Sequence, residues 1–144
     1  MSGHAIFRYK CEGVFPPCLY SCRVYGDGRV VLEENPPFDD RGVRTYEKHI
    51  PSEAVQKIKK LIDDHSAIFA IKEIKVDERI VTDAATETIS FASANRRNSF
   101  TIYALSVAEN ESGGILNPDF ELLTELHEAI REILIANGIS EDFC

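Results

Sequence analysis

The amino-acid sequence predicts an α+β fold: a mostly antiparallel sheet of five to six strands, in the element order ββββαββα, with two amphipathic helices on one face. Residues 19–34 have the pattern of a β-hairpin, other β-prone segments are joined by short polar connections, and two longer segments carry apolar residues at helical spacing. Hairpin-linked strands pair antiparallel, and helices then cover one side of the sheet. The sequence contains no linker or internal repeat, so we expect a single domain over residues 1–144.

The composition is typical of a globular protein. Of the 144 residues, 44% are hydrophobic and 28% are charged, and the formal net charge is -8. Phosphate binding needs clustered Lys and Arg, which this acidic chain lacks, so nucleic acid and anionic membranes are poor partners for it. No apolar run approaches the roughly 18 residues that span a bilayer, and residues 1–10 lack the features of an export signal. We therefore expect a cytoplasmic protein.

The first strand is expected over residues 5–11, where Phe7, Tyr9 and Cys11 share one side. Gly13, Pro16 and Pro17 should interrupt the ladder before the hairpin begins. After the hairpin, residues 35–42 form a polar loop rich in proline. Residues 43–50 follow as a strand that is polar on both sides, which suits the edge of a sheet.

The register of the hairpin depends on its loop. A three-residue loop, Gly26-Asp27-Gly28, needs a left-handed residue at its third position, where glycine is favoured. This register sets Val24 opposite Val30. The rival two-residue turn mixes polar and apolar groups on both faces, so we prefer the three-residue loop. The chosen register pairs Cys22 with Leu32 and places five side chains on the opposite face: Arg23, Tyr25, Arg29, Val31 and Glu33.

The two helices and the remaining strands follow from their patterns. The first helix is expected to start at residues 51–53, with Ser52 as its cap, and to stop near His65. Residues 67–71 then anchor its exit in the core. We interpret residues 72–80 as irregular. Strands follow at 86–93 and 99–105, joined by residues 94–98. Asn117 and Pro118 open the second helix, which ends at Asn137-Gly138, and Cys144 is expected to be exposed. The buried stripe of this second helix comprises Phe120, Leu123, Leu126, Ile130, Ile133 and Leu134.

The four cysteines indicate neither a metal site nor an obligatory disulfide. Cys18 and Cys22 lie too far apart along one strand to bridge each other, whereas Cys11 with either of them remains possible. Reduced thiols are the default in a cytoplasmic chain. No Cys-x-x-Cys pair or paired-histidine motif completes a zinc site, so we expect no metal and no cofactor.

The run YSCRVYGDGRVVLEE, followed by PSEAVQKIKKLI and VTDAATETISF, resembles a bacterial family described only as a domain of unknown function. That family has a Cys-Pro-x-Tyr segment, a Tyr-x-Asp-Gly turn and a Thr-Asp…Thr strand. The resemblance spans roughly residues 11 to 105, and the second helix agrees in type only. This chain departs from the family pattern in having Pro17-Cys18 in place of Cys-Pro, and it lacks the export signal that many members carry. The resemblance implies no activity, cofactor or partner. The matching residues are Tyr20, Tyr25, Asp27, Gly28, Thr82, Asp83 and Thr86.

Two groups of residues are candidates for function. Arg23, Tyr25 and Arg29 share the outward face of the hairpin, and a mixture of arginine and aromatic side chains is typical of protein contacts. The alternative is that another structural layer covers them. Asp83 with Thr86 is the second group. Asp83 has a structural interpretation, in which it accepts backbone amide hydrogens and ends a loop just before a strand, and a functional one, in which it acts as a general base beside a cleft.

We therefore predict a non-enzymatic binding or protein-interaction module that uses the helix-free face of its sheet, with a protein partner or self-association. The sequence has no glycine elbow around a nucleophile and no phosphate-binding loop, so it identifies no catalytic residue. The alternative hypothesis is a small-molecule-binding domain or a hydrolase, with Asp83 and one of the four histidines at a pocket.

Overall fold

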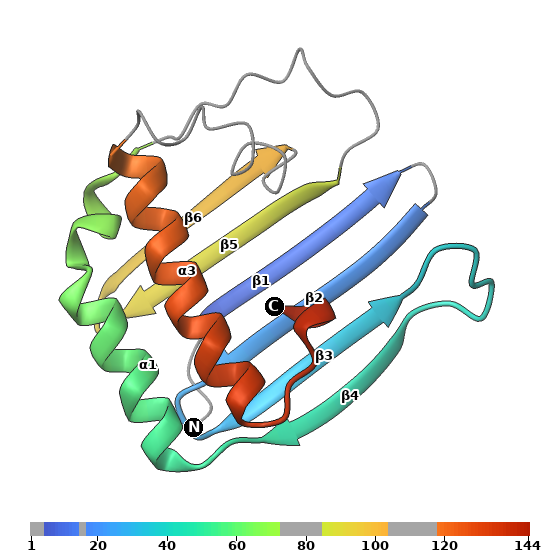
Figure 1. The fold of residues 1–144 in the computed structure, drawn as a ribbon, viewed down its shortest axis with the longest axis horizontal. Coiled ribbons are helices and arrows are strands. Elements are labelled where there is room, and N and C mark those ends of the chain that lie inside the picture. Colours follow the sequence, from blue (N-terminus) through green and yellow to red (C-terminus); the bar gives the residue numbers. More distant parts are fainter. Residues whose placement is uncertain (1–4, 15–16, 73–84, 104–117) are drawn as a thin grey trace.

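The computed structural model describes residues 5–14, 17–72, 85–103 and 118–144 (Figure 1). Within these residues six strands form one antiparallel sheet in the order β4-β3-β2-β1-β5-β6, which confirms the predicted α+β class. The strands are β1 (Ala5–Val14), β2 (Pro17–Tyr25), β3 (Arg29–Asn35), β4 (Arg44–His49), β5 (Thr86–Ser93) and β6 (Arg96–Tyr103). The helices are α1 (Ser52–Asp64) and α3 (Pro118–Ala136), with short 3₁₀ helices η1 (Ser66–Ala70) and η4 (Glu141–Phe143).

Both long helices lie side by side on one face of the sheet, as expected (Figure 1). The core fills the space between this face and the helices, and burying these apolar side chains drives the two layers together. The largest fully buried side chains come from strands and helices alike: Phe7, Val24, Leu32, Ile58, Ile62, Ile68, Ile89, Phe91, Leu123, Leu126, Ile130 and Leu134.

The hairpin of β2 and β3 has the predicted register. Val24 pairs with Val30 and Cys22 with Leu32, and all four side chains are buried. Gly28 has a φ of 94°, which a glycine adopts without the strain that a side chain would cause. Asp27 accepts a hydrogen bond from the Arg29 amide at 3.0 Å, so this aspartate helps to close the turn.

The prediction that Gly13 and Pro17 interrupt the first two strands was wrong. The ladder continues through Gly13, which pairs with Cys18, and ends where Val14 pairs with Pro17. Proline is tolerated at this position because it is the first residue of its strand. The four cysteines described are free, so the structure contains neither of the disulfides left open for Cys11.

The connection between the last two strands is shorter than the sequence suggests. β6 begins at Arg96 rather than at residue 99, and a turn at residues 94–95 joins it to β5. Ala94 has a φ of 52°, a left-handed conformation that side chains other than those of Asn and Asp rarely adopt. The expected core residues of this pair, Ile89, Phe91, Phe100 and Ile102, are all buried.

Where the structure describes them, the ends of the helices agree with the sequence except at the start of α1; the predicted Asn117 cap lies outside the described residues. Pro51 occupies the N-cap position of α1 and no side chain caps the helix, so Ser52 is its first residue and not its cap. Gly138 follows α3 with a φ of 92°, the left-handed conformation in which glycine commonly terminates a helix. Beyond it, η4 folds back over β2 and β3, and this packing buries Cys144, which was expected to be exposed.

Candidate functional site

The second face of the sheet is the helix-free face, since both long helices cover the other one (Figure 1). Side chains alternate between the two faces of a strand, so the register assigns each residue to one face. The helix-free face includes these residues, from β4 across to β6: Thr45, Glu47, His49, Arg29, Val31, Glu33, Ser21, Arg23, Tyr25, Arg8, Lys10, Glu12, Thr86, Thr88, Ser90, Arg97, Ser99 and Thr101.

Arg29 and Tyr25 form the best-defined contact on this face. The guanidinium carbon of Arg29 lies 4.4 Å from the centre of the Tyr25 ring, which is a cation–π geometry. The Nε atom of Arg29 lies 3.9 Å from an oxygen of Glu47 in β4, too far for a hydrogen bond. The structure therefore places Tyr25 and Arg29 on one face, as predicted, and brings the guanidinium over the ring.

Arg23 lies among charged neighbours from three strands. It pairs directly with Arg8 on β1 and with Val31 on β3, whose own partner on β4 is Glu47. One Nη atom of Arg23 lies 3.6 Å from a carboxylate oxygen of Glu33, which also accepts a hydrogen bond from the buried Ser21 hydroxyl at 3.2 Å. The Arg23 ion pair is longer than a charge-assisted hydrogen bond.

Both arginines have donors that the described hydrogen bonds do not use fully. Their side chains are about one-third exposed, at 34% for Arg23 and 32% for Arg29. The Nε atom of each is buried and has no hydrogen-bond partner. A buried donor without a partner costs free energy, and guanidinium groups are suited to bidentate contact with carboxylates. The exposed third of each side chain leaves room for a contact with an external anion.

The helix-free face has a charge balance opposite to that of the whole protein. The protein has a formal net charge of -8, yet basic residues outnumber acidic ones on this face. The basic residues are Arg8, Lys10, Arg23, Arg29 and Arg97, and the acidic residues are Glu12, Glu33 and Glu47. Sequence reasoning named only the hairpin arginines, although the alternation of residues 5–11 also placed Arg8 and Lys10 opposite the core side of the first strand.

Thr86 lies on the same face but not in the same cluster. It pairs with Glu12 on β1 and begins β5, whereas Tyr25 pairs with Ala5 at the opposite end of β1. Further along β5, hydroxyl groups link this strand to β6: the Ser90 and Ser99 hydroxyls form a hydrogen bond of 2.8 Å. Asp83 lies outside the described residues, so the pocket hypothesis built on it stays a prediction.

The described histidines do not converge on a site. His49 is exposed on β4 and His65 follows α1. His127 is a buried residue of α3, and its ring stacks on Tyr9 of β1 with 5.1 Å between the ring centres. The His127 Nε2 atom hydrogen-bonds the Cys144 carbonyl oxygen at 2.8 Å. Burial in apolar surroundings lowers the pKa of His127 to about 4, which keeps the ring neutral near pH 7. Its role is packing.

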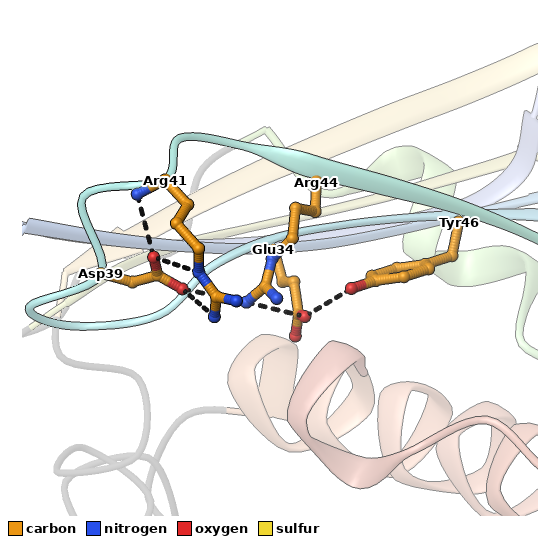
Figure 2. Close-up of polar contacts among 5 residues, drawn as sticks. All are labelled: Glu34, Asp39, Arg41, Arg44 and Tyr46. Carbon is orange, nitrogen blue, oxygen red and sulfur yellow. Dashed lines mark hydrogen bonds and ion pairs between the residues drawn. The ribbon is translucent and has the colours of Figure 1, made fainter.

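The loop between β3 and β4, residues 36–43, carries a polar cluster that the sequence did not predict (Figure 2). Asp39 accepts bonds from the Arg41 amide and guanidinium and from Arg44, each at 3.0 Å. Hydrogen bonds from Arg41 hold the pKa of Asp39 at about 2, so the carboxylate is ionised. Glu34 continues the cluster, because it pairs with Arg44 at 3.3 Å and accepts from the Tyr46 hydroxyl at 2.9 Å. The Asp-x-Arg spacing was the only local signal for this arrangement.

The described part of the chain holds no cluster of three metal-ligating side chains and no long apolar helix. No group of three His, Cys, Asp or Glu side chains there is arranged to hold a metal ion. Among the same residues, no helix combines the length and apolar character needed to cross a bilayer.

The comparisons with known proteins do not place the chain in a family. No family model matches it, and no curated protein matches it significantly. The resemblance of the hairpin and the Thr82-Asp83 segment to a bacterial family of unknown function stays a prediction. Function must therefore be argued from the surface itself.

Proposed function

We propose that the protein is a non-enzymatic interaction module whose helix-free face binds a protein partner through acidic side chains of that partner. The observation that supports this most strongly is the direct pairing of Arg8 with Arg23 across β1 and β2. Like charges opposite each other destabilise a sheet, so a protein keeps such a pair at some cost to stability. A carboxylate placed between the two guanidinium groups would relieve the repulsion.

The surrounding contacts fit the same role. Arg23 and Arg29 hold their internal acidic partners at 3.6 and 3.9 Å, beyond the length of a strong hydrogen bond. A partner carboxylate can approach more closely and form the bidentate geometry that arginine favours. Tyr25 adds an aromatic surface beside Arg29, and interfaces are enriched in both residue types. Because these side chains are already partly buried, little side-chain entropy is lost on binding.

A glutamate-rich peptide is the simplest probe of this proposal. We expect the peptide to bind the full chain, with a dissociation constant measured by fluorescence anisotropy. Replacing both paired arginines, Arg8→Gln with Arg23→Gln, should weaken binding by about tenfold or more, because each charge-assisted hydrogen bond contributes on the order of 1 kcal/mol.

The matched control removes the same charge from the helix side. Lys60 and Arg96 are both exposed, and neither lies on the helix-free face. The variant Lys60→Gln with Arg96→Gln should bind the peptide nearly as well as the native chain. An equal loss of affinity in both double variants would mean that the peptide responds to net charge alone, and the proposal would then be wrong.

A further inference from the structure

Phe38 is exposed in a way that packing does not explain. Its side chain is 91% exposed, the highest value among the large hydrophobic residues described as exposed. Its φ of 63° lies in the left-handed region, which is unfavourable for a bulky residue. It follows two prolines in a tight turn, closed by the bond from the Asp39 amide to the Pro36 carbonyl at 3.2 Å. At this turn position glycine is the favoured residue.

The loop that carries Phe38 is held in one shape. Asp39, the next residue, is fixed by Arg41 and Arg44, and Arg44 also contacts Glu34 on β3 (Figure 2). Backbone strain persists only where surrounding contacts enforce it, and such strain gathers at functional positions. The loop therefore presents a phenyl ring to solvent on a rigid support, which is how an anchor residue binds a pocket at low entropic cost.

The surface of the same protein has a groove large enough for a phenyl ring. It lies between the start of α1 and the end of α3 and has a volume of about 180 Å³. An enclosed apolar cavity of about 150 Å³ accepts benzene, so a phenyl ring is small enough to enter a groove of this volume. Its apolar lining is Pro51, Ala54, Ile133 and Ala136, and Glu53, Lys57 and Asn137 complete it.

The charged residues around the anchor and the groove are complementary. Exposed Asp40 and Arg41 follow Phe38 closely, with the Arg41 side chain 68% exposed. The groove is flanked by Glu53 and Lys57, with side chains 83% and 65% exposed. Arg41 can thus face Glu53 while Asp40 faces Lys57, and such pairs at the edge of a contact fix orientation more than they add affinity.

The anchor cannot fill the groove of its own chain. β4 runs from the loop to the start of α1, and its six residues, at about 3.3 Å each, separate the two by about 20 Å. We propose that the protein self-associates head to tail, with Phe38 of one copy inserted in the groove between α1 and α3 of a second copy. Because the two surfaces differ, each added copy leaves one anchor and one groove free.

Pairing of two copies along the β4 edge is a poorer alternative. An antiparallel pair centred on Tyr46 would set Arg44 opposite Lys48 of the second copy, and one centred on Glu47 would set that glutamate against itself. Like charges opposite each other oppose pairing, and charged side chains on an edge strand commonly protect it.

Sedimentation velocity on the full chain tests the proposal. The contact is small, so the association should be weak, with a sedimentation coefficient that rises between micromolar and millimolar concentration. Phe38→Gly removes the ring and relieves the strained φ, so this variant should be monomeric and melt no lower than the native chain. Ala136→Arg fills the groove from an exposed helical position and should also be monomeric.

Mixing the two variants gives the sharpest outcome. Phe38→Gly keeps the groove and Ala136→Arg keeps the anchor, so an equimolar mixture should form a heterodimer and nothing larger. Ile135→Ala is the control, because Ile135 is 40% exposed on α3 but does not line the groove, and it should associate like the native chain. A monomeric native chain, association that survives either substitution, or a mixture that stays monomeric would each overturn the proposal.

Discussion

Arg8 and Arg23 are direct neighbours across β1 and β2 on the helix-free face, and like charges opposite each other destabilise a sheet. Replacing Arg8 with threonine removes the repulsion and suits a strand. We expect Arg8→Thr to raise the free energy of unfolding by about 0.5 kcal/mol, measured by urea denaturation. The same substitution should weaken binding of the glutamate-rich peptide. Arg8→Lys keeps the charge and should leave stability nearly unchanged. A less stable Arg8→Thr variant would contradict the assigned repulsion.

The contact between Tyr25 and Arg29 should be measurable as a coupling energy. Tyr25→Leu and Arg29→Met each remove one partner and retain apolar volume. The double-mutant cycle should give a coupling of about 0.5–1 kcal/mol, as for cation–π pairs near the surface. Additive effects of the two substitutions on the free energy of unfolding would show that the ring and the guanidinium do not interact.

Gly28 joins the hairpin turn to the start of the first helix. Its carbonyl accepts from the Ile50 amide at 2.9 Å, and a Cβ atom there would lie 2.6 Å from the Ile50 carbonyl oxygen. Gly28→Ala should therefore lower the free energy of unfolding by about 2 kcal/mol or more. Gly42→Ala is the matched control: Gly42 also has a positive φ, of 86°, but its Cβ would meet no atom within 4 Å. Its cost should be about 1 kcal/mol. Equal losses would refute the contact with Ile50.

The buried His127 should make stability depend on pH. Its folded pKa of about 4 lies below the ordinary value of 6.5, so the unfolded chain binds more protons between these values. The contribution of the neutral ring is complete above about pH 6.5 and is lost as the pH falls to about 4, with a total on the order of 3 kcal/mol.

The measurement compares the native chain with His127→Gln, which can still donate a hydrogen bond to the Cys144 carbonyl. Urea denaturation from pH 7 to pH 4 should show a steeper fall for the native chain. Parallel curves would show that His127 does not titrate with a lowered pKa.

Local patterns in the sequence predicted much of the fold. The hairpin register followed from Gly28 and the alternation around it, and the edge position of β4 followed from its polar character on both faces. The two helices followed from their apolar spacing. These features depend on residues close together in the chain, and the same alternation placed Arg23, Tyr25 and Arg29 on one face.

The errors arose where distant contacts or unusual backbone conformations decide the structure. Ala94 adopts a positive φ that its residue type does not signal, so the β5–β6 turn was predicted too long. Cys144 is buried because η4 folds back over β2 and β3, which the local pattern does not encode. The cluster around Asp39 also needs the β3–β4 loop to bring Glu34 and Arg44 together.

The most direct test of the proposed function is a map of where an acidic partner binds. Amide chemical shifts of the ¹⁵N-labelled full chain, followed during titration with the glutamate-rich peptide, should change most around Arg8, Arg23 and Val31, which form one row across β1, β2 and β3. The amides of α1 and α3 should change little. Shifts that concentrate on the helices, or that spread evenly over the surface, would contradict a binding site on the helix-free face.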